Sequence, residues 1–346
     1  MASKNDFIKI YRESFRSTRR WDDWFLNEVY TDENMLALEA DGRTVSVLLA
    51  QPYRVSLYGS DLQGTYLSCV ATAASERGKG YMSRLVAQAI GQSAARGDAI
   101  AMLIPETRRL YFFYSRFGFA TAFYVDEQRY TSVHSFVMPD EYVPVEPTYD
   151  IFAPLEELSA CCVRHTRTDF SRILRDIEID GGKVVAVEGP DGSRAMAFAS
   201  VGDLVTVKAI PSTDTEAAEA ALAVLRTEVG EKPLAVWANP ADKVDHLRAR
   251  GMARIIDAAA VLGAVAAAHP KTEMAIRLHD PMIEANNAVF VLSHGQCRTV
   301  AYDEFKGKTD LDVRIDVLAM VLFSAPSVAS IFNLPGCRPR MQLMLD

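Results

Sequence analysis

The spacing of hydrophobic residues predicts alternating helices and strands over residues 1–138. Apolar residues recur at helical spacing over residues 7–15 and 24–30, with polar breaks between them. The following apolar runs predict strands over residues 35–39, 43–49, 55–58, 66–72, 99–104 and 119–129, and helices over residues 80–95 and 110–117. This order of elements predicts an α/β domain.

A second unit with a similar order of elements follows a proline-rich linker. Pro139, Pro144 and Pro147, with acidic residues between them, mark this linker. The pattern then predicts helices over residues 155–177, 215–229 and 241–250, and strands over residues 183–187, 194–201, 204–210, 234–237 and 252–261. Residues 113–119 also parallel residues 246–252, because each segment is a predicted short helix that ends in glycine and precedes a strand. We therefore predict an internal duplication, with the second copy over residues 139–265.

The remaining residues, 266–346, do not repeat this order. Strands are predicted over residues 288–292, 297–302 and 311–315, and helices over residues 316–323 and 327–332. The chain is therefore expected to have three domains, over residues 1–138, 139–265 and 266–346: two α/β units with mixed sheets, followed by an α+β domain.

Composition narrows the classes of partner. A hydrophobic fraction of 49% indicates a globular protein with a sizeable core, and the net charge of -8 argues against nucleic acid. A run of eighteen apolar residues and a signal-peptide h-region are both absent from the sequence, so we expect a cytoplasmic protein that neither spans nor binds a membrane. The five cysteines include no C-x-x-C pair, and the six histidines show no metal-ligand spacing near them. We expect free thiols and no bound metal.

The stretch most indicative of chemistry is the glycine-rich loop Arg77-Gly78-Lys79-Gly80. It follows an apolar strand and opens an amphipathic helix. Helix N-termini carry unpaired N–H groups and a partial positive charge, and glycines allow a ligand to approach the backbone. The loop is thus a candidate phosphate site, although an empty structural turn would have the same pattern.

A second motif, in which Phe113-Tyr114 precedes Arg116-Phe-Gly-Phe119, gives the loop its context. Together the two resemble the GNAT superfamily of N-acetyltransferases. The resemblance implies that acetyl-CoA is the co-substrate and that the strand before the loop splays from its neighbour to pair with the pantetheine arm. It assigns the pyrophosphate to the loop and the pantetheine arm and thioester carbonyl to the preceding strand. The residues concerned are Ser75, Glu76, Arg77, Gly78, Lys79 and Gly80 in the loop, and Ser68 and Val70 in the strand.

Two of these loop residues differ from what the superfamily favours. Ser75 replaces the usual glutamine or arginine, and Glu76 adds a negative charge where pyrophosphate is expected. Both changes weaken the electrostatic attraction, and Arg77 and Lys79 are expected to compensate for them.

Tyr114 matches the tyrosine that acts as general acid in many members of this superfamily. A positioned phenol can protonate the thiolate of coenzyme A as it leaves. The alternative is that Tyr114 is a packed aromatic within the run 111–117. The second unit has Leu247 at the matching place and lacks an R-G-x-G loop, so we expect it to bind no cofactor.

The whole chain resembles the enhanced-intracellular-survival (Eis) family, in which two acetyltransferase-like units, the second degenerate, precede a sterol-carrier-protein-like domain. The resemblance implies a homohexamer and an aminoglycoside-like amine or a lysine side chain as acceptor. It also implies that a C-terminal α-carboxylate serves as general base, which here belongs to Asp346. An aspartate end departs from the aromatic residue usual in that family, and a frayed terminus is the alternative.

The acceptor site is the hardest to read from the sequence. Trp21, Asp22, Asp23 and Trp24 could hold a polycationic amine, or Asp22 could be a helix N-cap with both tryptophans in the core. We expect an acetyl-CoA-dependent N-acetyltransferase that acts on a small cationic amine. The alternatives are a protein or peptide lysine acetyltransferase and a non-catalytic protein that binds acyl-CoA or lipid.

Overall fold

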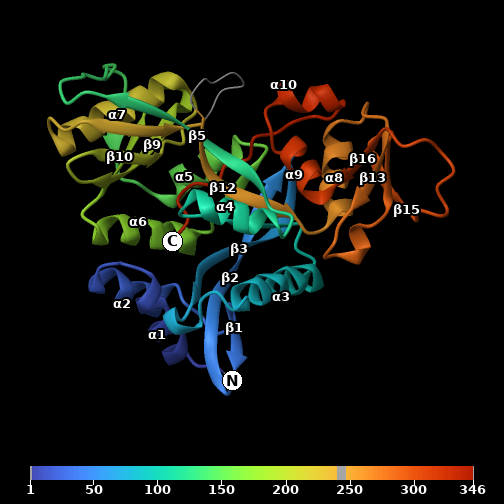
Figure 1. The fold of residues 1–346 in the computed structure, drawn as a ribbon. Coiled ribbons are helices and arrows are strands. Elements are labelled where there is room, and N and C mark those ends of the chain that lie inside the picture. The colour runs from blue at the N-terminus through green and yellow to red at the C-terminus, as the bar shows by residue number, and fades with distance from the viewer. Residues whose placement is uncertain (1, 240–246, 346) are drawn as a thin grey trace. The chain divides into compact units, whose positions relative to one another are not determined.

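The computed structural model describes residues 2–239 and 247–345 and has a mixed α/β fold (Figure 1). The described residues form two compact units. Unit 1 runs to Phe123 and includes Ala249–Pro339, and unit 2 comprises Tyr124–Arg248 and Arg340–Leu345. The chain therefore leaves unit 1 within strand β5 (Ala120–Tyr130) and returns to it within β12 (Leu247–Ile255).

Unit 1 contains a mixed sheet that carries most of the predicted site residues. Its strand order is β1 (Met35–Ala40), β2 (Arg43–Leu57), β3 (Ser60–Thr72), β4 (Ile100–Leu103) and β12. The β3–β4 pair is parallel, whereas the other neighbouring pairs described in this unit are antiparallel. The prediction of two strands over residues 43–58 is wrong, because residues 43–57 form the single strand β2, which pairs with β3 from Ser46 to Leu57.

Four helices accompany this sheet: α1 (Lys4–Ser14), α2 (Arg19–Glu28), α3 (Tyr81–Arg96) and α4 (Arg108–Ser115). The apolar face of α3 packs against β1, β2 and β3, and α1 packs against β2 and β3 (Figure 1). The two glycines predicted to end the helices over 80–95 and 110–117, Gly97 and Gly118, have positive φ angles of 77° and 82°. Glycine suits these positions because other residues are strained in that conformation.

A second sheet of unit 1 has the order β15 (Gln296–Val300), β14 (Val289–Ser293), β13 (Met274–His279) and β16 (Leu311–Arg314). Helix α8 (Ala258–Ala268) packs against β14 and β15. Its alanines are small enough for close helix–sheet contact. The chain continues into α9 (Ile315–Leu322) and α10 (Pro326–Ala329).

Unit 2 contains the strands β5, β11 (Leu234–Ala238), β10 (Val205–Ala209), β9 (Arg194–Val201), β8 (Lys183–Glu188) and β6 (Val143–Val145), in that order. Helix α7 (Thr215–Val229) covers one face of β8 and β9, and α5 (Tyr149–Glu157) and α6 (Arg167–Ile179) lie on the other face (Figure 1). Strand β9 is largely buried, as expected for a strand covered on both faces.

The prediction of one helix over residues 155–177 is wrong. Helix α5 ends at Glu157, β7 (Cys162–Arg164) follows, and α6 begins at Arg167. A capping box fixes this start: the Thr166 hydroxyl accepts from Asp169 N at 3.2 Å, and the Asp169 carboxylate accepts from Thr166 N at 2.8 Å.

The predictions over residues 241–261 also need correction. Residues 241–246 lie outside the described part of the chain, but Leu247–Arg250 belongs to strand β12 rather than to a helix. The strand predicted over 252–261 ends at Ile255, because Asp257 accepts from Ala260 N at 2.9 Å and starts α8. The proposed parallel between residues 113–119 and 246–252 is therefore not a parallel between two helices.

The five cysteines differ in oxidation state. Cys69, Cys162 and Cys297 are free thiols, whereas Cys161 and Cys337 are disulfide-bonded. The prediction of free thiols is confirmed for the first three and wrong for the other two.

Within the described ranges, each helix is too short or too polar to cross a lipid bilayer. The same residues contain no group of three or more His, Cys, Asp or Glu side chains arranged to hold a metal ion.

Candidate active site

Strands β3 and β4 part in the middle of the unit 1 sheet. The ladder between them joins Gly64 to Ile100 and Tyr66 to Met102 and, among the described residues, goes no further, while β3 continues to Thr72. The backbone edge of β3 beyond Tyr66 is thus not paired with β4. Such an edge can accept an extended ligand as if it were another strand.

An irregularity distorts β3 at the same place. The register between β2 and β3 shifts between Val47 and Leu49, and Cys69, at φ 52°, lies in the left-handed region. This conformation is uncommon for a residue other than glycine and redirects the backbone locally. Next to Cys69, the buried hydroxyl of Ser68 donates to Gln51 Oε1 at 2.8 Å, and the side chain of Val70 is partly buried.

The loop after β3 leaves backbone donors free at the start of α3. Gly78 and Gly80 both have φ 81°, and a Cβ atom at either position would meet nothing within 4 Å. Gly80 is the N-cap of α3 and gives it no side-chain cap. Among the described residues, no backbone carbonyl accepts from the N–H groups of residues 77–80. The loop therefore fits an anionic group at a helix N-terminus.

The charged side chains of the loop are tied to one another and to α1. Glu76 and Lys79 form an ion pair at 2.8 Å, which lowers the pKa of Glu76 and raises the pKa of Lys79. Arg77 donates to Thr72 O at 3.1 Å and to Ser14 Oγ at 3.2 Å. Arg77 thus fixes the loop, and Lys79 offsets the charge of Glu76. Ser75 is exposed.

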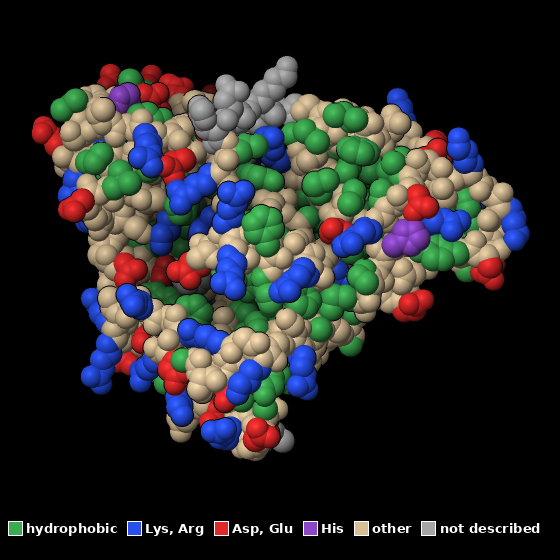
Figure 2. Space-filling view, in the orientation of Figure 1, with side chains coloured by type: hydrophobic (Ala, Val, Ile, Leu, Met, Phe, Trp, Pro, Cys, Tyr) green, Lys and Arg blue, Asp and Glu red, His purple; other side chains and the backbone are tan. Residues whose placement is uncertain are grey.

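The surroundings of α3 and α4 carry positive charge although the whole chain is acidic. Figure 2 shows Lys and Arg side chains over this part of unit 1. Arg84 in the first turn of α3, and Arg108 and Arg109 at the start of α4, are exposed. A local excess of positive charge favours an anionic ligand.

Tyr114 lies at the end of α4 and is 5% exposed. It packs in one apolar cluster with Leu67 and Val70 of β3 and Met82 of α3, and its ring meets that of Phe119 edge-on. Burial raises the pKa of Tyr114 above its ordinary value, so the phenol keeps its proton. The structure thus brings the predicted acid, the distorted strand and the start of α3 together.

The four predicted acceptor residues, Trp21, Asp22, Asp23 and Trp24, divide into buried and accessible ones. The Trp21 ring is buried and stacks on Phe25 at 4.8 Å, and Asp22 is 8% exposed. Asp23 is exposed and Trp24 is half-buried.

The carboxylate of Asp22 already has partners. It accepts a short hydrogen bond from Ser17 Oγ and lies 3.7 Å from the guanidinium of Arg12. The N-cap of α2 is Thr18, whose hydroxyl accepts from Trp21 N at 3.2 Å, so the alternative that Asp22 caps this helix is wrong.

Asp346 lies outside the described residues. The segment before it belongs to unit 2, where Val163 N donates to Arg340 O at 2.9 Å and Arg340 N donates to Cys161 O at 3.0 Å.

Two polar residues at the site were not predicted. Gln51 lies buried beside Ser68 and, like Ser68, stands in a strand of mostly apolar residues. Arg254 is fully buried in β12 and donates to Phe117 O at 2.7 Å. The sequence feature that could have identified Arg254 is its place as a lone arginine within the apolar run Met252–Ile256, because a buried charge requires a partner.

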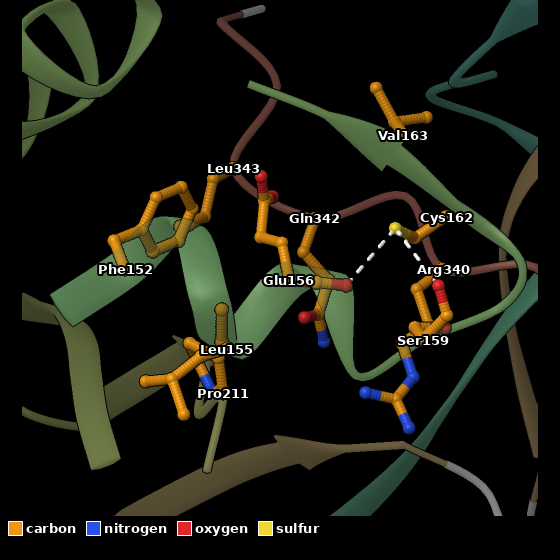
Figure 3. Close-up of a pocket in the computed structure, with 11 residues that line it drawn as sticks. Phe152, Leu155, Glu156, Ser159, Cys162, Val163, Pro211, Arg340, Gln342 and Leu343 are labelled. Carbon is orange, nitrogen blue, oxygen red and sulfur yellow. Dashed lines mark hydrogen bonds between the residues drawn. The ribbon is translucent and has the colours of Figure 1, made fainter. Parts of the chain in front are cut away.

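A pocket in unit 2 does not have the character of an active site (Figure 3). Its cavity volume is about 30 Å³, which leaves room for roughly two water molecules. The Cys162 thiol points to carbonyl oxygens, 3.6 Å from Glu156 O and 3.9 Å from Ser159 O (Figure 3). Burial raises the pKa of Cys162 to about 11, which disfavours the reactive thiolate.

Residues 2–122 match the family model of the acetyltransferase (GNAT) domain. This range includes the parted strands, the glycine loop and Tyr114. The protein is an acyltransferase, and the match of residues 2–122 to the GNAT acetyltransferase domain implies acetyl-CoA as co-substrate. No curated protein matches the sequence.

Solved structures resemble the fold over nearly the whole chain. Eis1 from Mycobacterium abscessus has a TM-score of 0.73 at 14% sequence identity, over 98% of this chain and 97% of that one. A GCN5-related N-acetyltransferase from Kribbella flavida has a TM-score of 0.76 at 15% identity, over 99% and 95%. A conserved protein from Enterococcus faecalis V583, a probable N-acyltransferase, has a TM-score of 0.75 at 13% identity, over 97% and 92%.

Proposed function

We propose that this protein transfers the acetyl group of acetyl-CoA directly to a primary amine of a small, aminoglycoside-like cationic molecule. The observation that carries the proposal is the open N-terminus of α3, with Gly78 and Gly80 in the left-handed region, after a strand that leaves β4 at Tyr66. The backbone of the loop would hold the pyrophosphate, and the edge of β3 near Ser68 and Val70 would hold the pantetheine arm.

In the proposed reaction, the amine nitrogen attacks the thioester carbonyl carbon and the carbon–sulfur bond breaks. A backbone N–H near Val70 would stabilise the oxyanion. Tyr114 would give its proton to the leaving sulfur, and its position in one cluster with Leu67 and Val70 of β3 supports this role. The proton of the amine would pass to a base, to which we assign the α-carboxylate of Asp346 by resemblance to the Eis family. Positioning the two substrates together would supply much of the rate.

Asp23 and Trp24 support a cationic acceptor better than their neighbours do. The Asp23 carboxylate lies 3.6 Å from Arg12 and 3.8 Å from Arg19, but it is exposed, and together with the Trp24 ring it offers an ammonium group an anion and an aromatic face. Trp21 packs in the core, and Asp22 is hydrogen-bonded by Ser17 and lies near Arg12. These two residues would therefore support the site without contacting the acceptor.

We further propose that unit 2 is a degenerate copy of the catalytic domain. Its parallel strands β10 and β11 pair from Val205 to Val207 and the β9–β10 register then shifts, much as the β3–β4 ladder is short and β2–β3 shifts in unit 1. The helix that follows differs, because Asp214 accepts from Ala217 N at 2.8 Å and so occupies the N-terminus of α7 with its own carboxylate. An intramolecular carboxylate at this position supports the absence of a phosphate site in unit 2.

The remaining assignments rest on the resemblance to the Eis family. We propose domains over residues 1–138, 139–265 and 266–346, the last of them sterol-carrier-like. We also propose a cytoplasmic homohexamer without nucleic-acid or membrane partners.

Acetyl-CoA turnover tests the proposal. Thiol release would be followed with aminoglycosides, polyamines and lysine peptides, for wild type, Tyr114→Phe and Tyr111→Phe. Tyr111 is the matched control, since it belongs to the same helix. We expect turnover on small amines that Tyr114→Phe lowers by at least about 100-fold and Tyr111→Phe leaves within about threefold. Turnover on peptides alone would favour a lysine acetyltransferase, and CoA binding without thiol release on any acceptor would overturn the proposal.

The role of Asp346 needs a separate test. Blocking its α-carboxylate by adding glycines after it would leave the segment 340–345 intact. An undiminished rate in that variant would remove the carboxylate from the mechanism.

A further inference from the structure

Arg254 is a fully buried charge that the proposed reaction does not use. It lies in β12, paired with Ala101 of β4, and its exposure is 0%. A guanidinium without partners would be very costly at such a position, so its hydrogen bonds explain why it is there.

The Asp280 carboxylate, both oxygens of which accept hydrogen bonds, anchors one end of the guanidinium. Arg254 Nη2 donates to both oxygens of Asp280, at 2.7 and 2.8 Å. The Asp280 carboxylate also accepts from Met282 N at 2.9 Å, Ile283 N at 3.3 Å and Asn286 Nδ2 at 2.9 Å. These bonds fix the carboxylate and therefore the arginine.

The other end of the guanidinium holds the end of helix α4. Arg254 Nη1 donates to Phe117 O at 2.7 Å, and Phe117 N in turn donates to Tyr114 O at 2.9 Å. Through this one residue, the buried ion pair is connected to the backbone of the proposed general acid.

Gly118 shows how tightly the arginine approaches this turn. Its φ is 82°, and a Cβ atom added there would lie 1.8 Å from Arg254 Nη1. Glycine is therefore required at this position both for its conformation and for the space that the guanidinium occupies. The Arg-x-Gly-Phe motif after Tyr114 is thus shaped in part by Arg254.

We infer that Arg254, held by Asp280, is a positioning residue for Tyr114: it fixes the end of α4 so that the phenol reaches the leaving sulfur. The inference rests on the proposed function for its catalytic consequence. A general acid contributes to the rate in proportion to its alignment, and a displacement of about 1 Å can cost about 100-fold.

Steady-state kinetics test the catalytic consequence. Arg254→Lys keeps the charge but cannot reach both Asp280 and Phe117 O. Asp280→Asn keeps the shape of the side chain but binds the guanidinium less tightly. We expect kcat to fall by about 10- to 100-fold in each, with the KM for acetyl-CoA within about twofold, because the loop of residues 75–80 is unchanged. Arg248→Met, on the same strand but in an exposed pair with Glu127, is the matched control and should keep wild-type kinetics. Equal losses of kcat in this control would overturn the inference.

A double mutant separates positioning from general loss of stability. If Arg254 acts through the Tyr114 phenol, Arg254→Lys should lower the rate of Tyr114→Phe by less than about twofold. A further loss as large as that seen with Tyr114 present would overturn the inference.

A spectroscopic measurement gives an answer that does not depend on turnover. In 3-fluorotyrosine-labelled protein, the ¹⁹F resonance of residue 114, assigned by its loss in Tyr114→Phe, should shift or broaden in Asp280→Asn and not in Arg248→Met. An unchanged resonance in the folded Asp280→Asn protein would overturn the inference even if the wild type is active. A changed resonance in a protein without turnover would support the positioning and remove the acid role of Tyr114, so the two failures are distinguishable.

Discussion

The carboxylate of Glu76 lies 2.8 Å from the ammonium of Lys79, within the loop that opens α3. This pair brings opposite charges together at the place where we propose that a pyrophosphate binds. Its net effect is to reduce the positive charge that Lys79 would otherwise offer to that anion. The backbone of Gly78 and Gly80 then remains the main source of donors.

Glu76→Gln is therefore expected to strengthen coenzyme A binding. The substitution removes a negative charge near the pyrophosphate and frees Lys79, which should lower the Kd by about two- to fivefold at low ionic strength. Added salt should shrink the gain, because the loop is exposed and its charges are screened. Calorimetric titration at two salt concentrations measures both effects.

Glu178→Gln is the control for that titration. Glu178 pairs with Arg175 at the same three-residue spacing, but in unit 2. The Glu178→Gln variant should bind coenzyme A with the same Kd as the wild type. A weaker affinity in Glu76→Gln would instead mean that the carboxylate holds the loop in shape.

Gly80→Ala should impair coenzyme A binding more than it impairs stability. The site has room for a methyl group, but φ is 81°, a conformation that costs a residue with a Cβ atom about 1–2 kcal/mol. The loop would relieve this strain by leaving the conformation that presents its N–H groups. We expect a Kd raised by about tenfold and a small loss in thermal stability.

Gly91→Ala is the matched substitution within the same helix. Gly91 is in the interior of α3 and also has open space around its Cβ position. Alanine should stabilise the protein there by about 0.5–1 kcal/mol without changing the Kd. If both variants bound coenzyme A like the wild type, the loop could not be the pyrophosphate site.

The acid role of Tyr114 makes a prediction about pH. Burial raises the pKa of Tyr114 above its ordinary value of about 10. An acid that stays protonated cannot limit the rate below that pH, so kcat should show no alkaline decline between pH 7 and about 10. Because the raised pKa belongs to the folded state, the stability contributed by the neutral phenol is present below pH 10 and declines above it. A Tyr114-dependent fall in kcat with a midpoint near pH 8 would contradict this account.

Much of unit 1 could be predicted from the sequence because its signals are local. The run 66–72, the glycine loop and the helical periodicity after it were enough to predict the second half of β3, the turn and α3, although β3 begins earlier, at Ser60. Gly97 could be predicted as a helix end, since glycine is the usual residue there, whereas the C-cap of α4 is Arg116, two residues before the predicted Gly118. The breaks in the helix predicted over 155–177 were missed because a capping box at Thr166 outweighed the apolar periodicity.

Other features depend on residues that are distant in the sequence. The separation of β3 from β4 after Tyr66 was expected only through the resemblance to the GNAT superfamily, because the residues of the two strands do not themselves indicate where the strands diverge. Arg254 and Phe117 form a hydrogen bond across 137 positions of the chain. The arginine could be recognised as unusual in an apolar strand, but its partners could be found only after folding brought Asp280 and Phe117 together.

The cap of α7 provides a test of the proposed difference between the two units. Asp214 accepts from Ala217 N at 2.8 Å, and this hydrogen bond lowers the pKa of the carboxyl. Asp214→Ala should destabilise the protein by about 0.5–2 kcal/mol, as the loss of a helix cap usually does. Since unit 2 is proposed to bind no cofactor, coenzyme A affinity and turnover should be unchanged.

The loss of stability in Asp214→Ala should depend on pH. A folded-state pKa that is lowered contributes stability above the unfolded pKa of about 3.9, and this contribution is lost as the pH falls through the lower, folded value. The difference in stability between wild type and Asp214→Ala should therefore be constant from pH 5 to 8 and shrink below about pH 4. Denaturant unfolding across this range measures it. A loss of coenzyme A affinity in Asp214→Ala would argue that unit 2 contributes to cofactor binding, and a pH-independent difference would argue that the carboxylate cap is not the source of the stability.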